Sequence, residues 1–301
     1  MANTKALKGR IRSVSKTKQI TSAMQMVAAS RMRRAQESTR SSAPYALAAR
    51  ELLMMLSTHE SVKDHPLFTV RPVKTRLLIV IGADGGLAGA YTSNLMKLYA
   101  EQLVNDDKQG IKNATIVVGS KAAQFVSRLK DTVVLGSYQD LPDRPDGRQL
   151  HTILDTAQDK FTSGEVDAVD IVFTEYVNSL KQVARIIRVL PAGFGSEKSF
   201  LDDPEVNPRL ASPFNDAKYE PSAGAVLDGV AYRLVGAQLY QTLLEARASE
   251  YSMRMMAMKN ATDNAKYLID DLTLVMNKVR QAAITQELTE ISGGVEASNN
   301  G

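Results

Sequence analysis

The sequence has 301 residues, with 37 Lys and Arg against 33 Asp and Glu, so its formal net charge is +4. That length allows one or two domains with a full-sized core, and contents of 44% hydrophobic and 23% charged residues exclude a disordered or collagen-like chain. The chain has no cysteine, which excludes disulfide frameworks, thiol nucleophiles, thiolate-based zinc sites and iron–sulfur clusters.

The N-terminal segment is basic and favours a long helix. Neither glycine nor proline occurs in residues 10–43, where Ala, Met, Gln and Arg are common. Apolar residues continue at helical spacing beyond Pro44, so one helix is predicted from about Thr4 to Thr58, with a kink allowed at the proline. No acidic residue precedes Glu37, whereas nine basic residues do: Lys5, Lys8, Arg10, Arg12, Lys16, Lys18, Arg31, Arg33 and Arg34.

The middle of the chain alternates short β-rich runs with amphipathic segments. Strands are predicted at residues 77–82, 114–119, 132–135, 169–176 and 183–191. Helices between the first four strands are expected at residues 90–104, 121–129 and 148–161. This βαβ order is typical of a mostly parallel sheet with helices on its faces. Residues 74–191 are therefore predicted to form a Rossmann-like α/β domain.

The C-terminal third predicts a second long helix. Residues 192–222 are rich in Pro, Asp, Asn and Ser and are expected to form a connecting lobe. Neither glycine nor proline occurs in residues 237–292, so a helix is predicted over residues 223–292, with a tail at residues 293–301.

A heptad repeat in this helix indicates a partner. One seam is predicted at Val230, Ala237, Leu244, Tyr251, Met258, Ala265, Leu272 and Val279. The other is predicted at Tyr240, Ala261, Leu268, Val275 and Ala282. A repeat sustained over this span requires a facing helix. The simplest arrangement is a long antiparallel coiled coil with the N-terminal helix, residues 1–60, and the α/β domain at one end. The alternative is a pair of bent helices folded into a bundle.

Catalytic motifs are not evident in the sequence. His59, His65 and His151 are far apart and fit no metal-ligand spacing, so solvated or capping roles are expected. The run GADGGLAGAY at residues 82–91 follows a strand and precedes a helix, but its glycines fit neither GxGxxG nor GxxxxGK[ST]. A strand-to-helix turn is the preferred interpretation over a phosphate loop. No catalytic, cofactor-binding or metal site is predicted.

The basic N-terminal helix has two interpretations. Nine unopposed charges could bind nucleic acid by releasing counterions. However, few aromatic residues lie among them for stacking, and Met24, Met26, Val27 and Met32 place soft apolar groups between the charges. This mixture favours adaptable contact with protein. A coiled-coil scaffold or a nucleic-acid-binding helical protein remains the alternative function.

Both termini resemble the γ subunit of F-type ATP synthases. The resemblance is carried by LKGRIRSVSKTKQITSAMQMVAASRMRRAQ at residues 7–36, ARASEYSMRMMAMKNATDN at residues 246–264 and ITQELTEISGG at residues 284–294. It implies a non-catalytic rotor stalk without cofactors, in which the terminal helices stand inside a hexamer of three α and three β subunits. The ε subunit and the membrane c-ring are the implied partners of the α/β domain. The implied role is to transmit torque from the ring, coupling proton flow to ATP synthesis or hydrolysis.

The resemblance also implies partner-contact residues. Met24 and the basic residues around it match the segment facing an acidic hinge loop of the β subunit, and Arg254 matches another position near that interface. Residues 200–219 match the foot that meets ε and the ring. The implied contact residues are Lys16, Lys18, Met24, Arg31, Arg33, Arg34, Arg254, Gln281, Thr285 and Glu287.

Some positions depart from the family pattern. The family often has DRGL after the first strand, whereas this chain has DGGL with Gly85 in place of arginine. Without cysteine the chain cannot carry the regulatory dithiol of the chloroplast branch. No segment has the roughly 18 apolar residues of a membrane span, and no signal or organellar leader is evident. The expected location is the cytoplasmic face of a bacterial plasma membrane, with membrane contact only through the c-ring and no binding to nucleic acid.

Overall fold

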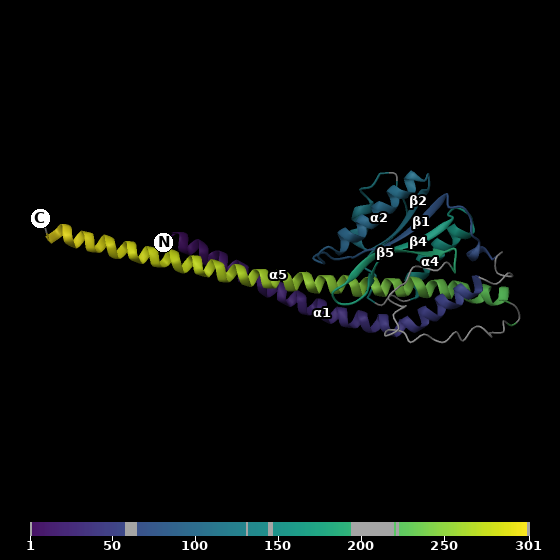
Figure 1. The fold of residues 1–301 in the computed structure, drawn as a ribbon, viewed down its shortest axis with the longest axis horizontal. Coiled ribbons are helices and arrows are strands. Elements are labelled where there is room, and N and C mark those ends of the chain that lie inside the picture. The colour runs from purple at the N-terminus through teal and green to yellow at the C-terminus, as the bar shows by residue number, and fades with distance from the viewer. Residues whose placement is uncertain are drawn as a thin grey trace. The chain divides into compact units, whose positions relative to one another are not determined.

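The computed structural model describes residues 2–57, 65–130, 132–143, 147–193, 220 and 223–299. The chain divides into two compact units. The terminal unit comprises Met1–Ala28 with Met255–Gly301, and the central unit comprises Ala29–Arg254. Figure 1 shows that the central unit holds a sheet with helices packed on it, whereas the terminal unit is helical.

The two ends of the chain are long helices, as predicted. Helix α1 spans Ala2–Ser57 and continues through Pro44. Helix α5 spans Ala223–Asn299, so glycines 293 and 294 do not end it. Most of the expected connecting lobe, residues 194–219, 221 and 222, lies outside the described residues.

Helices α1 and α5 pack together and run antiparallel (Figure 1). In the central unit, Ser42 donates a hydrogen bond to Gln241, and Arg31 lies 5.8 Å from the ring centroid of Tyr251. In the terminal unit, the hydroxyl of Thr262 donates to the hydroxyl of Thr21 at 2.8 Å. These contacts confirm the predicted pairing of the terminal helices.

One predicted seam of α5 is confirmed, and the second is wrong by one residue from Leu268 onward. In the first seam, five positions are buried: Ala237, Leu244, Tyr251, Met258 and Ala265. In the second, Leu268 and Val275 are 47% and 39% exposed, and Ala282 is exposed. Tyr240 and Ala261 of this seam are half-buried, as is Thr262 next to Ala261. Beyond them the half-buried residues lie one position later than predicted, at Ile269, Met276 and Ala283. They share a face with the first seam because steps of three and four residues alternate on a helix.

The central unit contains five strands in the spatial order β3-β2-β1-β4-β5. The first four are parallel to their neighbours, and β5 is antiparallel to β4, which confirms the mostly parallel sheet. The strands are β1 Thr75–Ile81, β2 Lys112–Val118, β3 Val133–Tyr138, β4 Ala168–Tyr176 and β5 Gln182–Leu190. The shorter helices are η2 Pro66–Phe68, α2 Tyr91–Lys108, α3 Ser120–Val126 and α4 Gly147–Thr162.

Alternating residues of the strands build two hydrophobic layers. From β1, Leu77, Ile79 and Ile81 face a cluster that includes side chains of α1, α4 and α5. The intervening Leu78 and Val80 face α2 and α3. This alternation follows from the two-residue period of a strand and explains why β1 is apolar along both faces. Helices α1 and α5 of the central unit are therefore part of the domain core.

Candidate partner interface

The predicted contact residues of the N-terminal helix differ in exposure within the terminal unit. Lys16 is exposed, whereas Lys18 and Met24 are half-buried. Lys18 shares the α1 face of Ile11, Val14 and Thr21, which all lie half-buried. Its aliphatic stem can cover the seam while its ammonium group reaches water. The charge is therefore presented at the edge of the helical pair.

Three further predicted residues lie on α1 of the central unit. Arg31, Arg33 and Arg34 are all exposed. The guanidinium of Arg31 is placed over the ring of Tyr251 from α5, a cation–π contact. None of the nine N-terminal basic residues forms an ion pair with any residue that the structure describes. Their positive charge is available to an acidic partner.

The C-terminal contact residues lie on the last turns of α5. Gln281, Thr285 and Glu287 are exposed, and the hydroxyl of Thr285 donates to the carbonyl oxygen of Gln281 at 3.0 Å. Every side chain described from Ile284 to Ser292 is exposed. These residues therefore lie on a part of α5 that no described segment covers.

Arg254 is engaged within the chain. Its guanidinium donates hydrogen bonds to the carbonyl oxygens of Gly85 and Gly86 and to the carboxylate of Glu250. The side chain is only 13% exposed. Unlike the nine N-terminal basic residues, which form no ion pair with a described residue, Arg254 holds the loop between β1 and α2 against α5. The structure does not group it with Gln281, Thr285 and Glu287, which belong to the terminal unit.

The loop between β1 and α2 contains the glycine run of the sequence. Gly82 is needed because an added Cβ would lie 2.7 Å from the Cβ of Ala122 in α3. Oδ1 of Asp84 accepts hydrogen bonds from the backbone N–H groups of Ser120 and Asp140 at 3.0 and 3.2 Å. These groups follow β2 and β3, at the edge where Rossmann folds hold phosphates. The chain's own carboxylate occupies them, which favours the predicted turn over a phosphate loop.

The charge of Asp84 is stabilised by Arg247 of α5. Nη2 of Arg247 donates to Oδ2 of Asp84 at 3.0 Å, and Nη1 donates to Glu250 at 3.1 Å. Burial alone would raise the pKa of Asp84, but hydrogen bonds from Ser120, Arg247 and Asp140 outweigh it, so this pKa lies below its ordinary value. Asp84 is therefore a carboxylate at neutral pH.

This ionic cluster was missed by the sequence reasoning. Of its members on α5, only Arg254 was singled out as a partner contact, and Glu250 was given no role. The spacing of Arg247, Glu250 and Arg254 by three and four residues places them on one face of α5. That spacing was the available signal for an internal charge network. It could not identify Asp84, which is distant in sequence.

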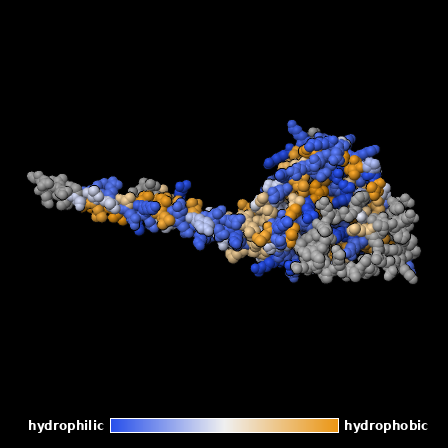
Figure 2. Space-filling view, in the orientation of Figure 1, coloured by the Kyte–Doolittle hydropathy of each residue, from blue (hydrophilic) through white to orange (hydrophobic). Residues whose placement is uncertain are grey.

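Large hydrophobic side chains are exposed on α5 of the terminal unit. Figure 2 shows hydrophobic residues in orange at the surface of this unit, among hydrophilic residues in blue. Ile284, Leu288 and Ile291 are 49%, 62% and 64% exposed and recur at helical spacing. Exposed apolar stripes of this kind mark contact surfaces. The part of the chain that the structure describes has no helix capable of spanning a membrane.

The chain resembles known proteins along nearly its whole length. The family model described as ATP synthase matches residues 3–297. The ATP synthase gamma chain of Acidithiobacillus ferrooxidans is 39% identical over 297 residues, covering 99% of this chain and 100% of the relative. That of Ralstonia nicotianae is 40% identical over 297 residues, with the same coverage.

Two solved structures have the same fold. A chain of the Euglena gracilis mitochondrial ATP synthase in rotational state 3 matches with a TM-score of 0.65 and 17% identity, covering 98% of this chain and 94% of that chain. A chain of the Tetrahymena thermophila mitochondrial ATP synthase central stalk and c-ring matches with a TM-score of 0.60 and 22% identity, covering 80% and 99%. Together with the full-length relatives, these matches show that the chain belongs to the ATP synthase gamma chain family.

Proposed function

We propose that this chain is the non-catalytic rotor stalk of a proton-translocating F-type ATP synthase. In this role it transmits torque between a membrane c-ring and three catalytic β subunits. Its partners are the α and β subunits, three of each, the ε subunit and the ring. It works at the cytoplasmic face of a bacterial plasma membrane and touches the membrane only through the ring. The membership in the gamma chain family supports this proposal, as does the engagement of the ionic groups near β1 within the chain.

The observation that carries the proposal is the solvent-exposed apolar stripe on the last turns of α5. Ile284, Leu288 and Ile291 are large, exposed and aligned along one face of the helix. Leaving such side chains in water forgoes roughly 1.5–3 kcal/mol each relative to burial. The surrounding hexamer of α and β subunits would cover this stripe. The polar residues Gln281, Thr285 and Glu287 would then contact the same hexamer beside the apolar stripe.

The electrostatic character of α1 supports an acidic partner. Lys16, Lys18, Arg31, Arg33 and Arg34 carry charges that no described acidic residue pairs, and Met24 lies among them half-buried. An acidic hinge loop of a β subunit is complementary to this surface. Each orientation of an asymmetric stalk then stabilises a different β conformation through different contacts. This differential contact is the means by which rotation changes the affinity for nucleotides.

Reconstitution tests this function. The full chain should co-purify with α, β and ε subunits and restore ATP hydrolysis to a complex depleted of its γ subunit. A chain that neither co-purifies with these subunits nor restores ATP hydrolysis would favour the alternative of a coiled-coil scaffold. Steep, salt-dependent binding to DNA in place of assembly would favour the nucleic-acid alternative.

A further inference from the structure

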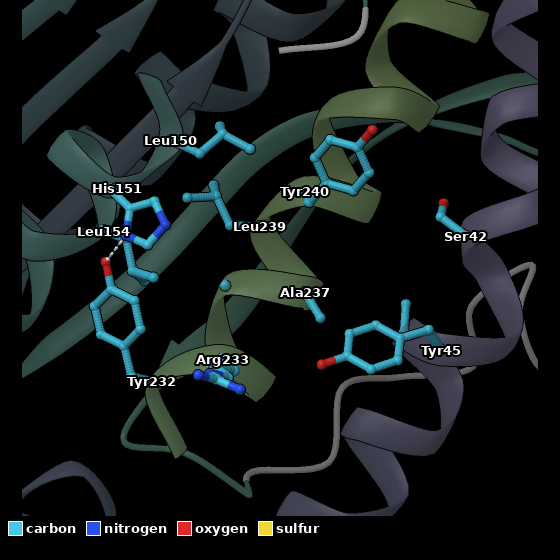
Figure 3. Close-up of a pocket in the computed structure, with 12 residues that line it drawn as sticks. Ser42, Tyr45, Leu150, His151, Leu154, Tyr232, Arg233, Ala237, Leu239 and Tyr240 are labelled. Atoms are coloured by element: carbon cyan, nitrogen blue, oxygen red, sulfur yellow. Dashed lines mark hydrogen bonds between the residues drawn. The ribbon is translucent and has the colours of Figure 1, made fainter. Parts of the chain in front are cut away.

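A cavity in the central unit is separate from the surfaces discussed above. Its volume is about 470 Å³, and residues of α1, α4 and α5 line it (Figure 3). This volume lies within the range of roughly 300–1,000 Å³ typical of small-molecule sites. The aliphatic part of the lining comes from Leu150, Leu154 and Leu239. A Cβ at Gly236 would lie 3.1 Å from Cδ2 of Leu154, so glycine lets α5 approach α4 closely beside the cavity.

One wall of the cavity is aromatic and held in place by hydrogen bonds. The rings of His151 and Tyr232 are stacked, with centroids 5.4 Å apart and an interplanar angle of 28°. The hydroxyl of Tyr232 donates to Oδ1 of Asp155 at 2.7 Å and lies 2.6 Å from Nδ1 of His151. Because the single phenolic proton is given to Asp155, the imidazole N–H must be the donor to the phenol oxygen. The wall is therefore a fixed flat surface, and the polar end of Tyr232 is already satisfied.

Three other polar groups at the cavity have no partner among the described residues. Arg233, Tyr45 and Tyr240 make no hydrogen bond or ion pair with any residue in the described part of the chain. Figure 3 shows the ring of Tyr45 extending from α1 toward α5, where Arg233 and Ala237 lie. The side chain of Tyr45 is 59% exposed. A cation and a free phenol thus flank an apolar space that has an aromatic wall.

We propose that this cavity is a binding site for a small planar aromatic carboxylate. The ring of the ligand packs on the leucine side chains and on the aromatic groups, while its carboxylate pairs with the guanidinium of Arg233. An arginine can bind a carboxylate through two parallel hydrogen bonds, and Tyr45 can donate a third. Such a ligand contacts α1, α4 and α5 at once, so its binding stabilises the packing of the terminal helices on the α/β domain. The proposal does not depend on torque transmission.

Calorimetric titration of the full chain with 2-naphthoate tests this site. We expect saturable binding with one ligand per chain and a rise in the thermal unfolding temperature. The neutral 2-naphthamide should bind at least tenfold more weakly, because it lacks the charge that Arg233 recognises. Arg233→Gln should weaken 2-naphthoate binding roughly tenfold and leave the binding of 2-naphthamide nearly unchanged. Tyr45→Ala should weaken the binding of both compounds.

A matched control is available on the same helix. Arg280 is also exposed on α5 and has no partner among the described residues, so Arg280→Gln should bind 2-naphthoate as the unmodified chain does. Circular dichroism should show that all variants are folded, because both Arg233 and Tyr45 are exposed. The proposal is overturned if the unmodified chain shows no saturable binding. Equal weakening by Arg233→Gln and Arg280→Gln would also overturn it, because binding would then reflect net charge.

Discussion

Arg254 donates a hydrogen bond to the main-chain carbonyl oxygen of Gly85 at 3.1 Å. A second bond of 3.1 Å reaches Gly86, and a third of 2.7 Å reaches Glu250. A Cβ at position 85 would lie 3.2 Å from Nη2 of Arg254. The absence of a side chain at position 85 therefore leaves room for an arginine from α5. In this chain, α5 supplies the cation that fixes the loop between β1 and α2.

Removing this cation should loosen the loop. Arg254→Gln loses hydrogen bonds to two carbonyl oxygens and leaves the buried Glu250 with Arg247 as its remaining cation. We expect the free energy of unfolding to fall by about 1–3 kcal/mol, as measured by urea denaturation. Hydrogen exchange of the amides in residues 84–90 should also accelerate.

The control for this variant is Arg34→Gln, which removes an exposed arginine of the same unit. It should change the free energy of unfolding by less than about 0.5 kcal/mol. Loop amides that exchange at the same rate in Arg254→Gln and in the unmodified chain would show that Arg254 does not fix the loop.

The antiparallel register of α1 and α5 can be trapped covalently. Because the hydroxyl oxygens of Thr21 and Thr262 are 2.8 Å apart and the chain has no cysteine, the double variant Thr21→Cys, Thr262→Cys should form an intramolecular disulfide under oxidation. A mobility shift on non-reducing gels measures it. The pair Ile20→Cys, Thr262→Cys should not cross-link efficiently, because Ile20 is 60% exposed. Equal cross-linking of both pairs would contradict the register.

The same region shows where sequence periodicity was sufficient and where it was not. The spacing of Ala237, Leu244, Tyr251 and Met258 predicted a buried seam because every member is apolar. The second seam was assigned to Leu268 and Val275, since these are the larger apolar residues. The structure buries Ile269 and Met276 more instead, and Thr262, a polar residue, lies on the same face. Hydrophobicity alone could not decide between steps of three and four residues.

Glu245 makes the stability of the central unit depend on pH. It is 3% exposed, and burial raises its pKa to about 7 from an ordinary 4.5. This value is the net of burial and the charge of Glu175 of β4, which raise the pKa, and of a hydrogen bond from Gln241 and the charges of Arg185 and Arg50, which lower it. The unfolded chain releases this proton near pH 4.5, and the folded chain holds it until about pH 7. The contribution of Glu245 to stability is therefore full below pH 4.5 and is lost as the pH rises to 7.

Glu245→Gln should remove this dependence. Relative to the unmodified chain, the variant should gain about 1–3 kcal/mol in the free energy of unfolding between pH 5 and pH 8, measured by urea denaturation at one-unit intervals. Asp84→Asn is the contrasting control. Because the pKa of Asp84 is lowered, its stabilising effect is present throughout this range, so that variant should be destabilised by a constant amount. A constant difference for Glu245→Gln as well would show that Glu245 is ionised in the folded chain.

The buried polar residues mark the limit of what the sequence predicts. The strands and helices of the α/β domain follow from local apolar runs, and most of their predicted ends agree closely with the structure. The largest differences are at the C-terminal ends of α2, α3 and β3. Glu245, Arg247 and Glu250 are each at most 4% exposed, although charged residues on a long helix are usually solvated. Arg247 pairs with Asp84 from the loop after β1, and Glu245 lies near the charges of Glu175, Arg185 and Arg50. The pairs within α5 follow a local spacing, whereas the pairing of Arg247 with Asp84 arises from tertiary contact and leaves no local pattern.

The surface around Met24 should govern coupling between proton flow and ATP chemistry. Met24→Lys adds a positive charge among Lys16, Lys18 and Arg31, where the proposed partner loop is acidic. An added ionic contact stabilises one orientation of the stalk over the others, so rotation past it is impeded. We expect ATP-driven proton pumping, per ATP hydrolysed, to fall severalfold in reconstituted vesicles while the thermal melt of the chain changes little. Met26→Lys adds the same charge at a side chain that is 66% exposed, on another face of α1, and should reduce coupling less. Unchanged pumping in Met24→Lys would remove Met24 from the interface, because a charge placed at a contacting face cannot leave the relative energies of the orientations unaltered.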